Sequence, residues 1–379
     1  MPLRADVNAE LLAWLNPDSL RRLNATWRGR GSGHPDEVIE DVVGRLSPET
    51  FDYEALLKHL EAQYLEDARE GHAAAYHGLY AWMAQLVSQI LYRRQVERRD
   101  SYREGLQYFE GLAHLARANR PLWIFSLNHD VLVECIAALF GIEVRCGFSE
   151  RRVALPCRNA AGQPIATLSA ALLTDAEMAS GRLGFFRAGW PGINLLKLHG
   201  ALDVFTFGDG RDLIRLLPKE ETFDAIIDAL QIANEGLLDP SLVPSVVGDS
   251  LVVTNRIPYL DAQNQPQVLG RTLLASAAQL TDPYPQLMQR RWLEYFRASL
   301  AQIDRLVAIG CSLTDDEVNE VVHGWLGENP ARVLAIVAPS SPNVAPGGPN
   351  VPPFLRPLAA QVELVAASTT IYLERLATR

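Results

Sequence analysis

The spacing of apolar residues divides the chain into a helical first third and an α/β remainder. Apolar positions recur at helical intervals, with no convincing strand pattern among them, in residues 9–15, 38–46, 53–64 and 73–118. After Pro121 the pattern changes to short apolar runs, each followed by a polar turn and a helical pattern: 122–127, 195–198, 306–309, 333–337 and 362–365. We therefore predict a mostly helical part over residues 1–120 and an α/β part over residues 121–379.

These apolar runs predict a parallel sheet covered on both faces. Apolar and polar residues do not alternate within them, which is typical of buried parallel strands. Because strand, loop and helix repeat in order, we expect a Rossmann-like α/β fold with a large helical subdomain and ligands at the carboxyl ends of the strands. Residues 148–192, rich in small and polar residues, are expected to form an insertion, and the proline-rich residues 339–353 a loop.

Composition narrows the class of protein. With 35 basic and 45 acidic residues, the net charge of -10 opposes general attraction to polyphosphate, so we expect no direct nucleic-acid binding. No apolar run approaches the ~20 residues of a membrane span, and the first residues lack the apolar core of a secretion signal, so we expect a cytoplasmic protein. The scattered cysteines predict neither a disulfide framework nor a zinc site: Cys135, Cys146, Cys157 and Cys311.

Three loops that follow predicted strands carry the candidate chemistry. They are Ser126-Leu-Asn-His-Asp130, the His199-Gly200 turn after the predicted strand that contains Leu196-Lys-Leu198, and Gly310-Cys-Ser-Leu-Thr-Asp-Asp316. In this order they resemble the three signature blocks of sirtuin-like NAD-binding domains: Thr-x-Asn-x-Asp, Leu-His-Gly and a Gly-x-Ser loop after a buried strand. The resemblance covers roughly residues 52–379, and three ordered blocks are far more specific than any one of them.

The branch that the chain resembles most is bacterial and acts in antiviral defence. Its members hydrolyse NAD, many work with a HerA-type ATPase or a short Argonaute, and several form large homo-oligomers. The resemblance therefore implies an NAD glycohydrolase that takes NAD as its substrate and releases nicotinamide and ADP-ribose. Sirtuin deacylases carry a four-cysteine zinc ribbon, which this chain cannot form, so a zinc-free deacylase or ADP-ribosyltransferase ranks last.

The resemblance assigns roles to individual residues. It implies that Asn128 positions water and the ribose near the anomeric carbon and that His199 is the general base, because an imidazole titrates near neutral pH. Asp130 would hold the ribose side of its loop or stabilise the developing cation. The residues implied to contact the rest of NAD are Ser126, Gly310, Ser312, Asp316 and, beside the adenine, Ala338.

Each of these residues also has an ordinary structural explanation. Asp130 could cap the helix expected over residues 131–139, and Asn128 could close an Asx-turn. His199 could be a hydrogen-bonded turn histidine, and Thr314 with Glu317 fits a capping box that accounts for the acidic cluster beside it. His129 has no assigned role and is expected to be exposed. The arginines of residues 93–103 predict a solvated face or an interface.

The chain departs from the sirtuin-like pattern at its beginning. Such a domain opens with a strand and a Gly-Ala-Gly-x-Ser loop whose amides hold the pyrophosphate. Gly29, Gly31 and Gly33 do not form this loop, because residues 23–28 before them make a poor strand. We hypothesise that the natural reading frame begins roughly 15–25 residues upstream. The alternative is a non-catalytic subunit of a defence complex that binds NAD or ADP-ribose or serves as a scaffold.

Overall fold

The computed structural model describes residues 4–66, 71–208, 210–237, 256–272, 283–311, 313, 315–339 and 352–377. Up to residue 118 the described chain is helical, as predicted for this part: α1 (Arg4–Trp14), α2 (Pro17–Gly29), α3 (Asp36–Val43), α4 (Tyr53–Glu66), α5 (Ala73–Glu97), α6 (Arg99–Leu106), the short η2 (Gln107–Phe109) and α7 (Glu110–Ala118). Helix α2 lies outside the apolar runs that predicted helices, and the run over residues 73–118 is divided among α5, α6, η2 and α7. Residues 23–28 lie in α2, which confirms that these residues do not form a strand before Gly29.

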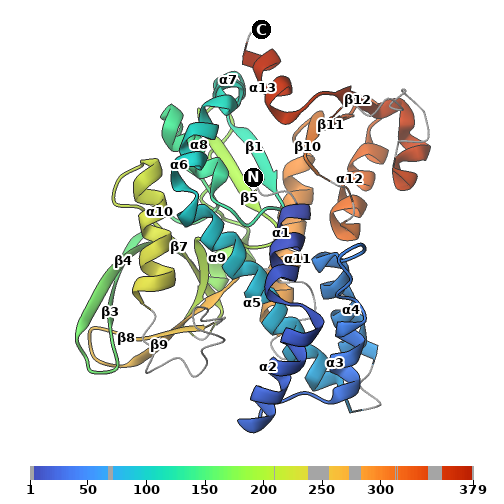
Figure 1. Ribbon diagram of the computed structural model, residues 1–379. Coiled ribbons are helices and arrows are strands. Elements are labelled where there is room, and N and C mark those ends of the chain that lie inside the picture. The colour runs from blue at the N-terminus through green and yellow to red at the C-terminus, as the bar shows by residue number, and fades with distance from the viewer. Residues whose placement is uncertain are drawn as a thin grey trace.

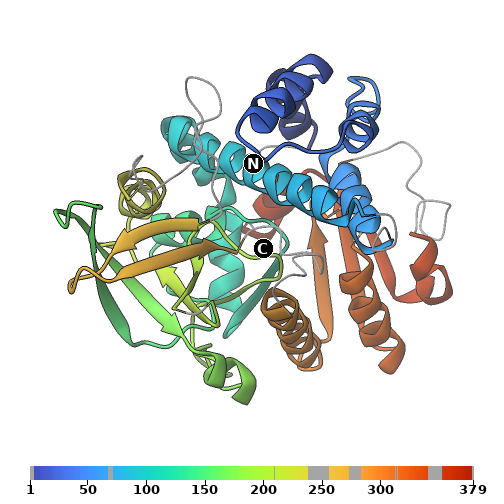
Figure 2. The same cartoon turned by 90° about the horizontal axis from the view of Figure 1, so that it is seen from below.

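Helix α5 is the axis of this helical part. It buries residues on all sides, among them Leu79, Met83, Val87 and Ile90, because α1 and α4 pack against one side of it and the rest of the protein against the other. In Figure 2 it crosses the molecule between the helices α1–α4 and the sheets. A helix that is apolar around its circumference is stable in water only when it is enclosed in this way.

The five strands expected after residue 121 are all present, but they form two separate parallel sheets (Figure 1). The first has the order β1-β5-β2 and the second the order β10-β11-β12, with bounds β1 (Leu122–Ser126), β2 (Val144–Arg145), β5 (Ile193–Lys197), β10 (Arg305–Ile309), β11 (Val333–Ala338) and β12 (Val362–Ala366). The mixed α/β class is therefore confirmed. The side chains of β1 and β10 are only partly buried, so the expected cover on both faces is incomplete for these two strands. Each of them pairs with one other described strand.

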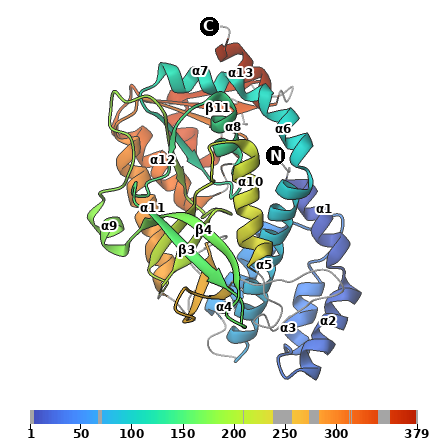
Figure 3. The same cartoon turned by 90° about the vertical axis from the view of Figure 1, so that its left-hand side faces the viewer.

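Helices cover these two sheets and join them through shared cores. They are α8 (Leu132–Phe140), α11 (Pro283–Leu300), α12 (Asp316–Glu328), the 3-10 helix η4 (Pro353–Gln361) and α13 (Thr369–Ala377). Figure 3 shows α7 and α13 side by side at one end of the molecule, where they pack together. A core formed by Leu196, Phe296, Trp325 and Leu334 connects the first sheet, α11, α12 and the second sheet.

A closed antiparallel barrel of six strands is the main feature that the sequence did not predict. Its order is β3-β4-β7-β6-β9-β8, with bounds β3 (Arg152–Arg158), β4 (Pro164–Leu173), β6 (Val204–Phe207), β7 (Asp212–Leu216), β8 (Arg256–Leu260) and β9 (Pro266–Arg271). The insertion expected over residues 148–192 supplies only β3, β4 and the short α9 (Asp175–Ser180); the other strands come from after β5. The barrel packs beside α10 (Phe223–Gln231), which continues into the π-helix η3 (Ile232–Gly236).

The cysteines and the lengths of the helices bear on two expectations from the composition. All four cysteines have free thiols. None of the helices in the described part of the chain is both long enough and apolar enough to cross a membrane.

Candidate functional site

Two of the predicted loops leave neighbouring strands at the same edge of the first sheet. Ser126 at the end of β1 is in register with Lys197 at the end of β5, and the Ser126 carbonyl accepts a hydrogen bond from the Leu198 amide at 2.9 Å. The loops remain joined further on, since the Leu202 amide donates to the His129 carbonyl at 2.8 Å. Parallel pairing thus holds the loops that carry Asn128 and His199 side by side.

Within the first loop, Asn128 is exposed and its backbone is fixed by a side chain. Its amide donates to Ser126 Oγ at 3.1 Å, so the tight turn comes from the Ser126 hydroxyl. Ser126 therefore has a structural role in shaping the loop.

The third loop has an unusual backbone conformation at the end of β10. Gly310 has a φ of 62°, which favours glycine, and Leu313 has a φ of 52°, which is rare for a branched side chain. Asn319 Nδ2 in α12 donates to the Leu313 carbonyl at 2.8 Å and holds this conformation. A Cβ at Gly310 would meet no atom of the described residues within 4 Å. The backbone conformation therefore favours glycine at this position, and no described residue occupies the space beside it.

His199 and Asp315 form the contact that brings the second and third loops together. His199 Nε2 lies 2.8 Å from Asp315 Oδ2, and both side chains are about one-quarter exposed. Asp315 is also the N-cap of α12, because its other oxygen accepts from the Val318 amide at 2.9 Å. Burial alone would raise the pKa of Asp315, but the hydrogen bonds from His199 and Val318 outweigh it and lower the pKa.

Two expectations about this region are corrected. The capping residue of α12 is Asp315, not Thr314, which lies outside the described residues. His129 is 8% exposed rather than solvated, and its ring centroid lies 6.4 Å from that of His199. Burial, with help from His199, lowers the pKa of His129 to about 3, so this ring is neutral at physiological pH.

Asp130 occupies a structural position at the start of α8. Its Oδ1 accepts from the Leu132 amide at 3.1 Å, an Asx-turn contact, whereas the N-cap of α8 is Val131, so Asp130 is not the cap that the sequence suggested. Its carbonyl accepts from Lys197 Nζ at 2.6 Å. Burial raises the pKa of Asp130, and the nearby Lys197 ammonium acts in the opposite direction. These contacts fix the carboxylate to the scaffold beneath the loop.

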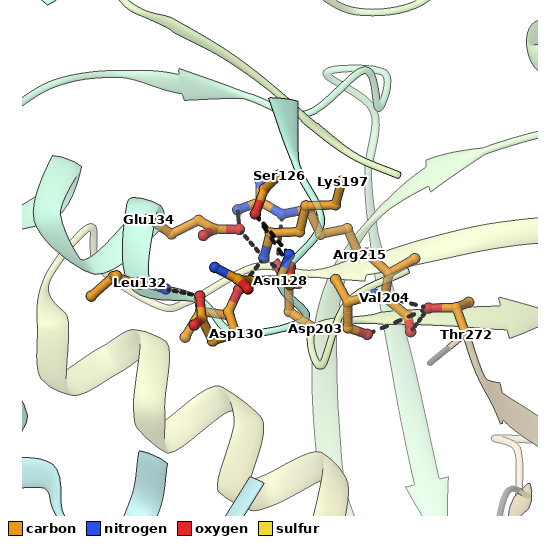
Figure 4. Close-up of polar contacts among 12 residues, drawn as sticks. Ser126, Asn128, Asp130, Leu132, Glu134, Lys197, Asp203, Val204, Arg215 and Thr272 are labelled. Atoms are coloured by element: carbon orange, nitrogen blue, oxygen red, sulfur yellow. Dashed lines mark hydrogen bonds and ion pairs between the residues drawn. The ribbon is translucent and has the colours of Figure 1, made fainter. Parts of the chain in front are cut away.

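Lys197 belongs to a buried group of four charged side chains that the sequence did not reveal (Figure 4). Its ammonium lies 2.7 Å from Glu134 Oε1 and 3.5 Å from Asp203 Oδ1, and Arg215 Nε donates to Asp203 Oδ2 at 2.9 Å. All four side chains are at most 15% exposed. We call this group the buried charge cluster. It connects α8, β5 and the barrel directly behind the candidate loops.

The remaining predicted residues lie at the same edges, with less specific contacts. Gly310 follows β10 and Ala338 is the last residue of β11, and since Ile309 pairs with Val337, both lie at the carboxyl edge of the second sheet. Asp316 is exposed at the first position of α12, and the carboxylate that faces His199 belongs to its neighbour. Ser312 lies outside the described residues.

The arginines of residues 93–103 are largely engaged within the molecule. Arg94 is buried and pairs with Glu10, while Arg99 and Arg103 both pair with Asp224 of α10. These pairs tie the helical part to α10, so the expected solvated face is in large part an internal contact.

Two cavities lie near the buried charge cluster. The smaller, about 30 Å³, has Lys197, Gly200 and Thr272 among its lining residues. The larger, about 380 Å³, lies between α8, β2, the barrel and α10. Neither lining includes Asn128 or His199. Among the described residues, no group of three or more histidine, cysteine or acidic side chains is arranged to hold a metal ion.

Comparison with known proteins adds no relative. No family model matches this chain, and no curated protein matches it significantly. The resemblance to sirtuin-like domains therefore rests on the three sequence motifs alone and stays a prediction.

Sequence reasoning missed two sets of residues in this region. It favoured Asp316 over Asp315, although Asp315 lies three residues before Val318, the first buried position of α12, which is the spacing of an N-cap side chain to the amide that it accepts from, and that signal could have selected Asp315. It also passed over Lys197 and Glu134. A lysine within an otherwise apolar strand requires a buried partner, and an acidic residue in the apolar run of α8 supplies one.

Proposed function

We propose that this protein binds NAD at the carboxyl edges of its two parallel sheets and hydrolyses the bond between nicotinamide and ribose. The observation that carries the proposal is the 2.8 Å contact between His199 and Asp315, because it joins a loop of each sheet. A histidine hydrogen-bonded to a carboxylate at such an edge is a common general-base arrangement in α/β enzymes.

The surroundings suit a dinucleotide. The open space at Gly310 allows a ligand to approach the backbone of the second sheet, with Ala338 beside it. The acidic residues at the start of α12 repel a phosphate group, but basic side chains are close to them. Lys58 of α4 interacts electrostatically with Asp315, and Arg290 of α11 with Glu317. In this arrangement the adenosine half lies over the second sheet and the nicotinamide riboside over the first.

The chemistry requires a water molecule and a base. Water attacks the anomeric carbon, the bond from that carbon to the nicotinamide nitrogen breaks, and nicotinamide leaves as a neutral molecule. One proton is released from the attacking water, and His199 accepts it. Asp315 orients the ring and stabilises the imidazolium that forms. Asn128 holds the water or the ribose hydroxyls from the neighbouring loop. In this proposal the role of Asp130 is to hold in place the loop that carries Asn128.

The wider biological role in this proposal comes from the three motifs alone. We propose that NAD depletion serves antiviral defence, with a HerA-type ATPase or a short Argonaute as partner and a homo-oligomer as the working assembly. Co-purification of the chain with the products of its neighbouring genes, followed by a measurement of mass in solution, tests this part separately from catalysis.

A second candidate is a non-catalytic subunit that binds NAD or ADP-ribose. It is favoured by Asp130, an expected catalytic residue whose carboxylate and carbonyl are both engaged in the scaffold. It is also consistent with the linings of the two cavities, which omit Asn128 and His199.

The decisive experiment follows nicotinamide release from NAD by the purified protein, resolved by chromatography. The enzyme predicts turnover that falls by about 100-fold or more in Asn128→Ala and in His199→Ala. His323→Ala is the matched control, because this histidine is exposed on α12 and away from the loops. A melting temperature raised by NAD without any nicotinamide release establishes the binding subunit instead. Release that survives His199→Ala refutes the proposed mechanism.

A further inference from the structure

The larger cavity is an open cleft that reaches the buried charge cluster, and its lining includes neither Asn128 nor His199. Its volume of about 380 Å³ falls within the range of small-molecule sites in proteins. Helix α8 contributes Ala137 and Ala138 to its wall, and α10 contributes Ile226 and Leu230. The barrel and the edge strand β2 close the other sides. Most of this wall is apolar, so a ligand that fills the cavity needs an apolar body.

The charged residues of the wall favour a cation. Five carboxylates and three guanidinium groups line the cavity: Glu134, Glu143, Glu150, Asp203 and Glu221, with Arg145, Arg152 and Arg215. The arginines are partly engaged already, since Arg145 pairs with Glu143 and Glu150, and Arg215 with Asp203. Lys197 also pairs with Glu134 and Asp203, so the five carboxylates exceed the nearby cationic groups by one, and this excess in a cleft with apolar walls favours cations.

Glu134, which lines the cavity, provides a specific acceptor, and Figure 4 shows its side chain beside Lys197 in the buried charge cluster. Its side chain is 4% exposed, and its Oε1 pairs with Lys197 at 2.7 Å. Its Oε2 has no hydrogen-bond partner among the described residues. A buried carboxylate oxygen without a donor is unfavourable, and a ligand that brings an N–H group removes this cost. Phe148 also lines the cavity and offers an aromatic ring to a cationic head group.

We propose that this cavity is a binding site for a small organic cation, in which a guanidinium or ammonium group donates to Glu134 and an apolar body packs between α8 and α10. A planar guanidinium suits the carboxylate best, because it presents parallel N–H donors. The proposal is independent of NAD chemistry, because the site shares neither Asn128 nor His199 with the candidate loops.

The experiment is isothermal titration of the whole chain, without NAD, using phenylguanidinium as the probe. Phenylurea is the neutral control of nearly the same shape. Ala138→Phe fills the cavity without touching a charged residue, and Leu139→Phe is its matched control, because Leu139 is the next residue of α8 and 45% exposed. Glu134→Gln keeps the size of the acceptor but removes its charge.

We expect saturable binding of phenylguanidinium that is at least about tenfold tighter than that of phenylurea. Binding is lost in Ala138→Phe, retained in Leu139→Phe and His199→Ala, and weakened about tenfold or more in Glu134→Gln. If Glu134→Gln does not fold, the pair of phenylalanine variants still decides the matter. Absence of saturable binding to the natural chain, equal binding of phenylurea, binding that survives Ala138→Phe, or loss of binding in His199→Ala overturns the proposal.

Discussion

Removal of the Lys197 ammonium probes the buried charge cluster most directly. The substitution Lys197→Met keeps a long apolar stem and removes the charge that faces Glu134 at 2.7 Å and Asp203 at 3.5 Å, together with the hydrogen bond to the Asp130 carbonyl at 2.6 Å. The cluster is then left with two carboxylates and one guanidinium, all largely withdrawn from water.

The expected cost follows from that uncompensated charge. Breaking a buried ion pair by removing one partner destabilises a protein by about 3–5 kcal/mol. Since folded domains are stable by only about 5–15 kcal/mol, Lys197→Met should lose a large share of the free energy of unfolding. Adding Glu134→Gln restores neutrality and leaves the Arg215–Asp203 pair at 2.9 Å intact. The double variant should therefore be more stable than the sum of the two single losses predicts, by about 1–3 kcal/mol.

Urea denaturation followed by tryptophan fluorescence measures these differences. Trp292 lines the small cavity beside Lys197, so the signal includes a reporter close to the cluster. Lys219→Met, at an exposed position, is the matched control and should change stability by no more than about 0.5 kcal/mol. A loss below about 1 kcal/mol in Lys197→Met, or strict additivity in the double variant, would refute the view that this charge is buried and paired.

Three further predictions concern the loops. Burial lowers the pKa of His129 to about 3, below the ~6.5 of an unfolded histidine. The neutral buried ring therefore costs no stability above about pH 6.5. As the pH falls from there toward 3, the free energy of unfolding should decrease by up to about 1.4 kcal/mol per pH unit, because only the unfolded chain takes up the proton. Urea titrations over this range should show a shallower acid decline for His129→Phe, and an unchanged slope contradicts the assignment. Gly310→Ala should cost about 1–2 kcal/mol through its φ of 62° alone, whereas Gly200→Ala should cost more, because its Cβ would overlap a neighbouring carbonyl; equal losses in thermal unfolding argue against this difference. If the proposed function holds, Asp315→Asn should reduce kcat for nicotinamide release by about tenfold or more, with the exposed Glu320→Gln as control, and a rate equal to that of the natural chain removes Asp315 from the mechanism.

The sequence by itself determined the elements whose signal is local. The helices α1, α3 and α4 overlap the predicted helical runs, whereas α2 and the division of residues 73–118 among several helices were not predicted. The strands β1, β5, β10, β11 and β12 lie where continuous apolar runs predict them. Because parallel strands end at a common edge, this also placed the motif loops at the carboxyl ends of the sheets. The candidate residues Asn128, His199 and Gly310 could be chosen for that reason.

Tertiary structure decided what depends on partners distant in the chain. The barrel closes through pairs such as Arg158 with Leu260, which local periodicity cannot reveal. The start of α12 decides the roles of the adjacent Asp315 and Asp316. Asp315 lies just before the helix and contacts His199, whereas Asp316 is the first residue of the helix. The charge of Lys197 is tolerable inside the protein only because folding brings α8 and the barrel to it, since an unpaired ammonium costs far more in a protein interior than in water.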